Sequence, residues 1–254
     1  MRTLLPSLAV VALLSAAANS AHAQITIDRE IVTLNPANAG ERISDFVVRN
    51  TGLTTISGSV QLEDWDVDAR GTSHWRKNGV VAGSCGNRVT VSPSALQLAA
   101  GEQQTVRVSL KANAHFDAEC WSAAVVNLSG AKGMANSNDS LASMRKTVPL
   151  YVTPTGLSVD GELSDMYVKD DSLEIVFKNT GKLRAKIIGQ VQVQTSNDSL
   201  VTTVPLEEAT VLVGATRRLR VAMPKLPRGS YVLMAVVDFG GDQLTTVQAA
   251  LEMR

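Results

Sequence analysis

The chain of 254 residues has no net charge, and this absence argues against several classes of partner. Its 24 Lys and Arg balance its 24 Asp and Glu. A neutral surface has no long-range field that would gather polyanions, so we expect neither nucleic acid nor an anionic membrane as a partner. The tightest basic cluster, Arg217, Arg218 and Arg220, is either a solvated strand face or a small binding patch.

The sequence also lacks the motifs of common catalytic sites. It contains no G-x-S-x-G, H-E-x-x-H or C-x-x-C motif and no glycine-rich phosphate loop. Cys120 lacks the context of a cysteine-protease nucleophile, and only His74 and His115 follow residue 23. Adjacent carboxylates such as Glu207 and Glu208 point to opposite faces of a strand. We therefore expect a protein without enzymatic activity, without a cofactor and without a small-molecule substrate.

Long apolar runs are missing everywhere except at the N-terminus. Arg2 precedes the run LLPSLAVVALLSAAA, and Ala21 and Ala23 occupy the two positions that a signal peptidase recognises. Residues 1–23 are therefore predicted to be a secretory signal peptide, cleaved before Gln24. No later stretch approaches the roughly 20 apolar residues that cross a bilayer. We expect an exported protein without a membrane-spanning segment.

Cysteine is rare as well, since the chain contains only Cys85 and Cys120. An isolated pair in an oxidising compartment is more often bonded than free, so we expect a disulfide bond between them. Trp121, which follows Cys120, is expected to lie in the protein core beside this disulfide, as a large ring commonly does in β-sandwich domains.

Helical spacing of apolar residues is absent from every long segment. Apolar and polar residues instead alternate with period two, as in TVRVSL at 105–110 and LEIVFK at 173–178. Alternation with this enrichment in β-branched residues predicts half-buried strands.

Four short blocks recur in the same order in the two halves of the chain. Six or seven strands in about 100 residues, present twice, predict an all-β protein of two tandem immunoglobulin-like antiparallel β-sandwiches. The Asn-Thr-Gly of the first block ends a strand in each copy, and its Gly is expected to provide a positive φ. The paired blocks are VVRNTG at 47–52 and VFKNTG at 176–181, ISGSVQL at 56–62 and IIGQVQV at 187–193, AAGEQQTVRVSL at 99–110 and LVGATRRLRVAM at 212–223, and AAVVNLSG at 123–130 and MAVVDFGG at 234–241.

Domain boundaries follow from the ends of the strand pattern. Pro154 and Gly156 stop strand pairing, so we place the first domain at residues 24–153 and the second at residues 154–254. The small, polar segment at 129–143 is expected to be a flexible loop before the last strand of the first domain.

The first copy carries an insertion that the second copy lacks. Asn50 and Gly101 are 51 residues apart, whereas the matching Asn179 and Gly214 are 35 apart. The extra residues fall at about 63–88, so if the two domains differ in function, we expect the residues responsible to lie there.

This insertion holds two sets of candidate residues. Trp65 and Trp75 form an alternative partner-binding surface if they are exposed, although both can instead be buried under the insertion. Asp64, Asp66 and Asp68 alternate, and we expect them on one solvated strand face rather than around a metal ion. The Gly and Glu that a calcium-binding EF-hand loop requires are missing.

Five segments of the first domain together resemble a known family. The segments are NAGERISDFVVRNTG at 38–52, VQLEDWDVDARG at 60–71, VTVSPSALQLAAGEQQTVRVSL at 89–110, CWSAAVVNL at 120–128 and VPLYVTP at 148–154. They are similar to the corresponding segments of the periplasmic pilus-assembly chaperone (PapD-like) superfamily. The resemblance implies a protein partner, a pilin-like or other surface-fibre subunit, whose incomplete sheet receives a strand from the chaperone. Together with the signal peptide, it also implies a location in the periplasm rather than secretion.

The resemblance also implies which strand is lent. It places the strand at residues 142–152, where Met144, Lys146, Val148 and Leu150 share one face and are the candidate partner-binding residues. The same alternating residues can instead build the core of the first domain itself.

One feature of the family is missing from this chain. Family members hold the terminal carboxylate of the subunit with an Arg and a Lys, but Leu34 and Pro149 occupy these positions, and Arg29 and Lys146 are out of register. We therefore expect a chaperone-like or accessory protein of pilus or fimbria assembly. The alternative is a non-catalytic immunoglobulin-like module with a structural or adhesive role.

Overall fold

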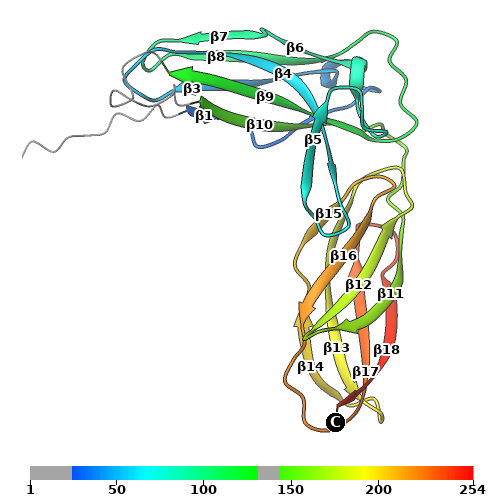
Figure 1. Ribbon diagram of the computed structural model, residues 1–254. Helices are drawn as coiled ribbons and strands as arrows, with labels where there is room; N and C mark the ends of the chain where they lie inside the picture. The colour runs from blue at the N-terminus through cyan, green and yellow to red at the C-terminus, as the bar shows by residue number, and fades with distance from the viewer. Residues whose placement is uncertain (1–24, 131–142, 254) are drawn as a thin grey trace, which may run out of the picture.

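The computed structural model describes residues 25–130 and 143–253 and consists almost entirely of β-strands. Two β-sandwiches follow one another along the chain and meet at an angle (Figure 1). The predicted all-β class with two immunoglobulin-like sandwiches is confirmed. The predicted signal peptide and most of the predicted loop at 129–143 lie outside the described residues. No helix in the described part of the chain is long and apolar enough to cross a membrane.

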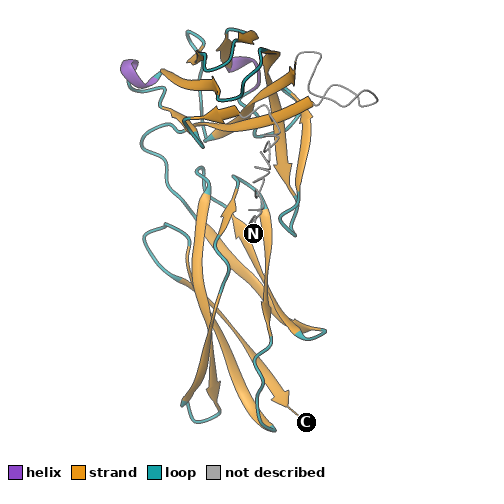
Figure 2. Cartoon of the chain, turned by 90° about the vertical axis from the view of Figure 1, so that its left-hand side faces the viewer, coloured by secondary structure: helices purple, strands orange, loops and turns teal. Residues whose placement is uncertain are grey.

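The first sandwich packs a four-stranded sheet against a six-stranded sheet, and two short 3-10 helices, η1 (Ala39–Glu41) and η2 (Gly86–Arg88), connect strands within it (Figure 2). The smaller sheet has the order β1-β3-β8-β6, and the larger has the order β2-β10-β9-β4-β5 with β7 paired to β4. The strands are β1 (Ile25–Ile27), β2 (Val32–Leu34), β3 (Ile43–Asn50), β4 (Ile56–Val67), β5 (Ser73–Lys77), β6 (Val89–Ser92), β7 (Ala95–Leu98), β8 (Gln103–Leu110), β9 (Cys120–Gly130) and β10 (Ser143–Val152).

The second sandwich repeats this topology with fewer strands. Its sheets have the orders β11-β12-β16 and β14-β13-β17-β18, with β15 paired to β13. The strands are β11 (Gly161–Lys169), β12 (Ser172–Asn179), β13 (Ala185–Thr195), β14 (Leu200–Pro205), β15 (Ala209–Val211), β16 (Thr216–Ala222), β17 (Gly229–Asp238) and β18 (Thr245–Met253). The division predicted after residue 153 falls between β10 and β11.

The repeated Asn-Thr-Gly has the same structural task in both domains. The Asn50 amide donates to the carbonyl oxygens of Thr54 and Leu98 at 2.7 and 3.1 Å, and the Asn179 amide donates to those of Leu183 and Val211, both at 2.9 Å. Both Asn side chains are fully buried. Each amide thus satisfies carbonyl groups that would otherwise be buried without a partner, which explains why the block recurs.

The glycine of the second copy is required for a different reason from the one predicted. Gly181 does not have a positive φ. A Cβ atom at this position would instead collide with the backbone of Asp160 and Ser158. Gly181 N–H also donates to Asn179 Oδ1 at 2.9 Å, so a close backbone approach selects glycine here.

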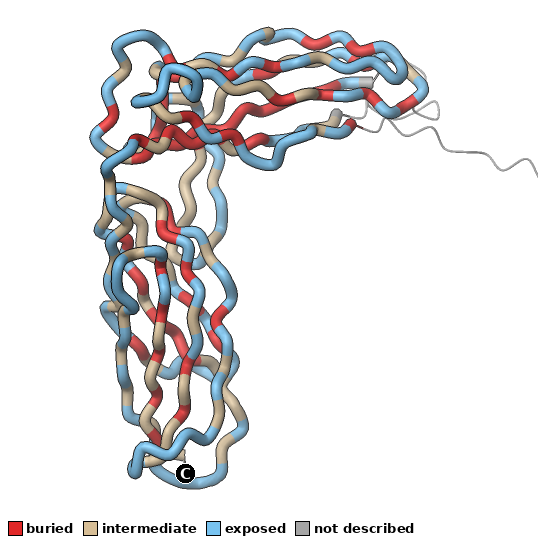
Figure 3. Tube along the Cα trace, turned by 180° about the vertical axis from the view of Figure 1, so that it is seen from behind, coloured by how far each residue is buried: buried red, intermediate tan, exposed pale blue. Residues whose placement is uncertain are grey.

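Each sandwich has its own apolar core, seen as the buried stretches that run along the strands in Figure 3. Cys85 and Cys120 form the predicted disulfide at the edge of the first core. The predicted place of Trp121 is wrong, because this side chain packs with Tyr151 and Leu212 on the outside of the sheet rather than in the sandwich core. Alternation puts neighbouring residues on opposite faces of a strand, and Trp121 takes the face opposite to Cys120.

The inserted segment holds the two domains together. Trp65 and Val67 of β4 pack in the same apolar cluster as Leu212 and Val213 of the second domain. At the tip of the β4–β5 hairpin, the carbonyl oxygen of Ala69 accepts a hydrogen bond of 2.7 Å from the backbone of Arg218.

A buried ion pair adds a second contact between the domains. Glu119, whose side chain is 1% exposed, accepts hydrogen bonds from the Arg184 guanidinium and from Arg184 N–H. The guanidinium also lies over the ring of Tyr151, with 3.9 Å between Cζ and the ring centroid. Burial raises the pKa of Tyr151 to about 12.

Candidate functional site

Strand β10 is hydrogen-bonded along its whole length on one side only. It pairs antiparallel with β9 from Ser143 to Val152. On its other side, β2 pairs with β10 in parallel, and only at residues 150–152. No described strand pairs with this second side at residues 143–149, so this part of β10 is a free edge. Figure 1 shows β10 on the side of the first domain that is turned toward the second domain.

The alternation of the backbone identifies which residues of β10 direct their N–H and C=O groups outward at the free edge, away from β9. Thr153 N–H donates to Leu34 O, toward the β2 side, at 2.8 Å. Because backbone groups alternate along a strand, Arg145 and Thr147 direct their N–H and C=O groups to this same side. Pro149 falls on this side too, so its missing N–H removes no bond to β9. The proline is therefore compatible with an edge strand.

The candidate partner-binding side chains divide into two pairs. Val148 and Leu150 are 1% and 0% exposed and belong to the core of the first sandwich. Met144 is half-buried and packs against that core, whereas Lys146 is exposed. For Val148 and Leu150, the alternative stated from the sequence is therefore correct: they build the core of the first domain. Contact with a partner is open to Met144, Lys146 and the backbone of the free edge.

On the side of β10 that faces β9, a side-chain bridge ties this edge strand to β4. Arg145 Nη1 and Nη2 of β10 donate to the two carboxylate oxygens of Glu63 on β4 at 2.9 and 2.8 Å. The same guanidinium lies 4.9 Å from the ring centroid of Trp75 on β5. Because β9 lies between β10 and β4, the bridge spans three strands.

The two tryptophans of the alternative surface are not equally exposed. Trp75 is 40% exposed, whereas Trp65 is half-buried. Their rings are 6.5 Å apart, and Trp65 also makes an edge-to-face contact with Tyr151 at 6.4 Å. A shallow groove of about 360 Å³ lies beside Trp75 and is lined by Glu63 and Lys77 among others.

The three alternating aspartates do not share a solvated face, so that prediction is wrong. Asp64 is fully buried and accepts hydrogen bonds from Val80 N–H, Val81 N–H and the hydroxyls of Ser84 and Ser122. This carboxylate organises the inserted loop, which folds back over β4.

The other two carboxylates have separate local partners. Asp66 pairs with Arg76 at 3.5 Å, and Asp68 caps the hairpin turn by accepting from Arg70 N–H and Thr72 N–H. Within the described residues, no group of three or more His, Cys, Asp or Glu side chains is arranged to hold a metal ion.

The positions that correspond to the carboxylate clamp have other tasks in this structure. Leu34 is fully buried in the first core, and Pro149 lies in β10. Arg29 is exposed and contacts the Ser44 hydroxyl at 3.4 Å. Arg184, whose guanidinium lies over the ring of Tyr151 in β10, is already paired with Glu119.

No family model and no curated protein matches the sequence. The fold is similar to that of solved fimbrial chaperones. The YadV chaperone is 14% identical with a TM-score of 0.51, and the match covers 89% of this chain and 99% of that chain. The class 5 fimbriae chaperone CfaA is 11% identical with a TM-score of 0.54, over 91% of this chain and all of the other. A structure of the chaperone–tip adhesin complex of CFA/I fimbriae matches at 11% identity with a TM-score of 0.55, over 90% and 98% of the two chains.

The chain therefore has the two-domain fold of the pilus chaperones. The resemblance inferred from the five segments of the first domain is confirmed at the level of the fold.

Proposed function

We propose that the protein is a periplasmic, chaperone-like or accessory protein of pilus or fimbria assembly, and that it binds a fibre subunit by β-strand addition. The subunit extends the larger sheet of the first domain, residues 24–153, at the free edge of β10, and residues 154–254 form the second domain beside it. The observation that carries the proposal is the edge at residues 143–149, whose outward backbone groups have no described partner strand. The pilus-chaperone fold supports it.

Backbone hydrogen bonds are the source of affinity in this mechanism, and side chains only adjust the register. Each strand hydrogen bond contributes about 0.5–1.5 kcal/mol net. The edge offers the N–H groups of Arg145 and Thr147 in particular, because Pro149 has none. Loss of a single outward N–H, together with the steric hindrance of a proline ring, is expected to weaken the complex at least about tenfold.

Thr147→Pro tests the proposal without disturbing the fold. The Thr147 N–H points away from β9, and its side chain is exposed, so the change costs no internal strand hydrogen bond. Thr147→Val is the matched control, since it keeps the N–H. Substitutions of Val148 or Leu150 cannot serve here, because both side chains lie in the core.

The experiment is co-purification of the tagged chain from its own periplasm, with bound proteins identified by mass spectrometry. A stoichiometric β-rich partner that the wild type and Thr147→Val retain and that Thr147→Pro loses supports strand addition. A partner that Thr147→Pro binds as well as the wild type refutes it.

The alternative structural or adhesive module is favoured by one observation, the exposure of Trp75 beside its groove. A partner that Trp75→Ala loses and Thr147→Pro retains would establish this second function instead.

A further inference from the structure

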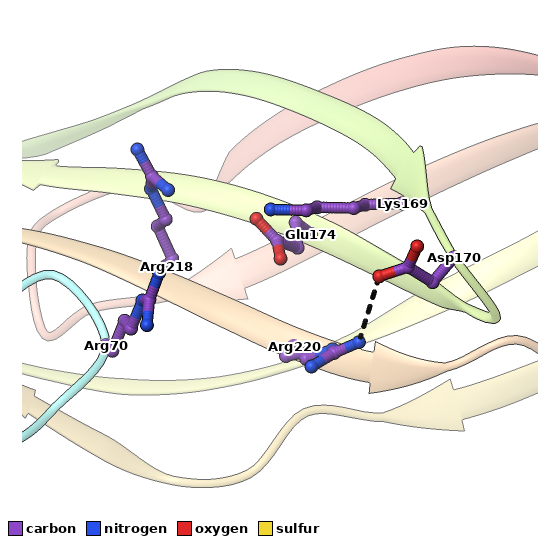
Figure 4. A pocket seen from close by; sticks show the side chains of 6 residues that line it. All are labelled: Arg70, Lys169, Asp170, Glu174, Arg218 and Arg220. Atoms are coloured by element: carbon purple, nitrogen blue, oxygen red, sulfur yellow. Dashed lines mark ion pairs between the residues drawn. The ribbon is translucent and has the colours of Figure 1, made fainter.

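A pocket of about 390 Å³ lies where the hairpin tip of the first domain meets the second domain. Figure 4 shows that its side chains come from three places: the β4–β5 turn, strand β16 and the β11–β12 hairpin. The first domain contributes only Arg70. The lining residues are Arg70, Lys169, Asp170, Glu174, Arg218 and Arg220.

The pocket has an excess of positive charge. Four of its six lining residues are cations and two are acids. Asp170 lies 3.9 Å from Arg220, and the Glu174 carboxylate accepts a hydrogen bond of 2.8 Å from the Tyr167 hydroxyl. This bond is the main cause that lowers the pKa of Glu174, and neighbouring cations add to it. Within the described residues, Arg70, Lys169 and Arg218 form no ion pair within 4.0 Å.

Contact between the domains brings these like charges together. The hydrogen bond from Arg218 N–H to Ala69 O fixes the turn against β16. Gly71, with a φ of +91°, lies so close to the Arg217 guanidinium that a Cβ atom would collide with it. Arg217 Nε is buried and has no hydrogen-bond partner. Repulsion among the guanidinium groups opposes the domain contact. An anion bound between them would attract each guanidinium group and so would favour the contact.

We propose that this pocket binds a small polyanion, a molecule with two or more phosphate or carboxylate groups, which bridges the two domains. Arg70 and Arg218 lie toward one end of the pocket, and Lys169 and Arg220 toward the other (Figure 4). Guanidinium groups donate two parallel hydrogen bonds to oxyanions, and the volume is that of a small-molecule site rather than of a single phosphate. The proposal is independent of strand addition by β10, which lies in the other half of the first-domain sheet.

Isothermal titration calorimetry of the full exported chain with pyrophosphate and with citrate tests the proposal. The ionic strength is held at about 0.15 M, so that general screening is constant. The two probes distinguish phosphate from carboxylate groups. The double variant Arg218→Ala, Arg220→Ala removes two cations whose side chains are exposed on β16, so the fold is retained. Arg49→Ala, Lys111→Ala removes the same charge from exposed positions of the first domain and is the matched control.

We expect at least one probe to bind the wild type and the control equally, and the double variant at least about tenfold more weakly. Arg70→Ala is expected to weaken binding severalfold as well, because the ligand contacts both domains. Failure of both probes to bind the wild type overturns the proposal. Equal binding by the double variant overturns it too, because Arg218 and Arg220 would then not hold the ligand. An equal loss in the control also overturns it, because the effect would then be one of net charge.

Discussion

Replacing Arg145 by alanine should loosen the free edge of β10 while leaving the rest of the protein intact. The change removes two hydrogen bonds to Glu63 and the contact with Trp75. The Arg145 side chain is 41% exposed, so solvent screens the ion pair, which contributes about 0.5–1 kcal/mol. The cation–π contact adds about 0.5–1 kcal/mol. We therefore expect the opening free energy of this strand segment to fall by about 1–2 kcal/mol.

Native-state hydrogen exchange measures this opening directly. Val148 N–H points to β9, and its exchange reports separation of the two strands. A loss of about 1–2 kcal/mol corresponds to exchange that is roughly 5- to 30-fold faster. Arg107→Ala is the matched control, because it removes an exposed ion pair with Asp45 in the other sheet. This control should leave the exchange of β10 unchanged.

The effect should also depend on pH in one direction. The hydrogen bonds from Arg145 are the main cause that lowers the pKa of Glu63 below its ordinary value of 4.5. A carboxyl whose pKa is lowered in the folded state contributes stability above its unfolded pKa, and this contribution is lost as the pH falls through the folded value. The difference between wild type and Arg145→Ala should therefore shrink as the pH falls from about 7 to about 3. Unchanged exchange in Arg145→Ala, or a difference independent of pH, would refute the reasoning.

Two further changes probe the contacts that organise the first domain and join it to the second. Replacing Cys85 and Cys120 by serine should lower the free energy of unfolding by about 2–4 kcal/mol in urea titrations; a value near zero would contradict this. Arg184→Met leaves the buried Glu119 carboxylate without its cation and should cost about 3 kcal/mol, with two separate domain transitions in calorimetry. Adding Glu119→Leu should recover most of the loss, and a further loss would contradict the account.

The sequence predicted the repeated framework well because the signals for it are local. The four recurring blocks fall on β3 and β12, β4 and β13, β8 and β16, and β9 and β17, in equivalent places of the two sheets. Alternation of apolar residues within one strand needs no knowledge of the rest of the chain. The disulfide followed from the count of cysteines alone.

The features that sequence reasoning missed depend on distant partners. Alternation defined two faces of β4 and β9 without showing that the inserted loop would bury Asp64 or that Leu212 would cover Trp121. The Arg145–Glu63 bridge joins residues 82 positions apart, and neither sequence neighbourhood points to the other. The basic pocket exists only because the hairpin tip approaches β16.

The sequence predicts the position of the candidate edge strand but not the orientation of its side chains or the length of its unpaired part. The resemblance predicts residues 142–152 as the strand that would be lent, but which of their side chains turn inward depends on the facing sheet of the first domain. The length of the free edge is set by β2, which pairs with β10 only at residues 150–152 and leaves residues 143–149 unpaired on that side. The short extent of β2 is a tertiary feature that strand propensity does not encode.

The hairpin at residues 63–77 also bears on how the two domains are held relative to one another. Two similar sandwiches joined end to end move relative to one another unless an interface between them fixes their angle. The segment by which the copies differ supplies Trp65, Val67 and Ala69 to the junction. The part of the first domain that has no counterpart in the second thus helps to fix the angle between the two domains.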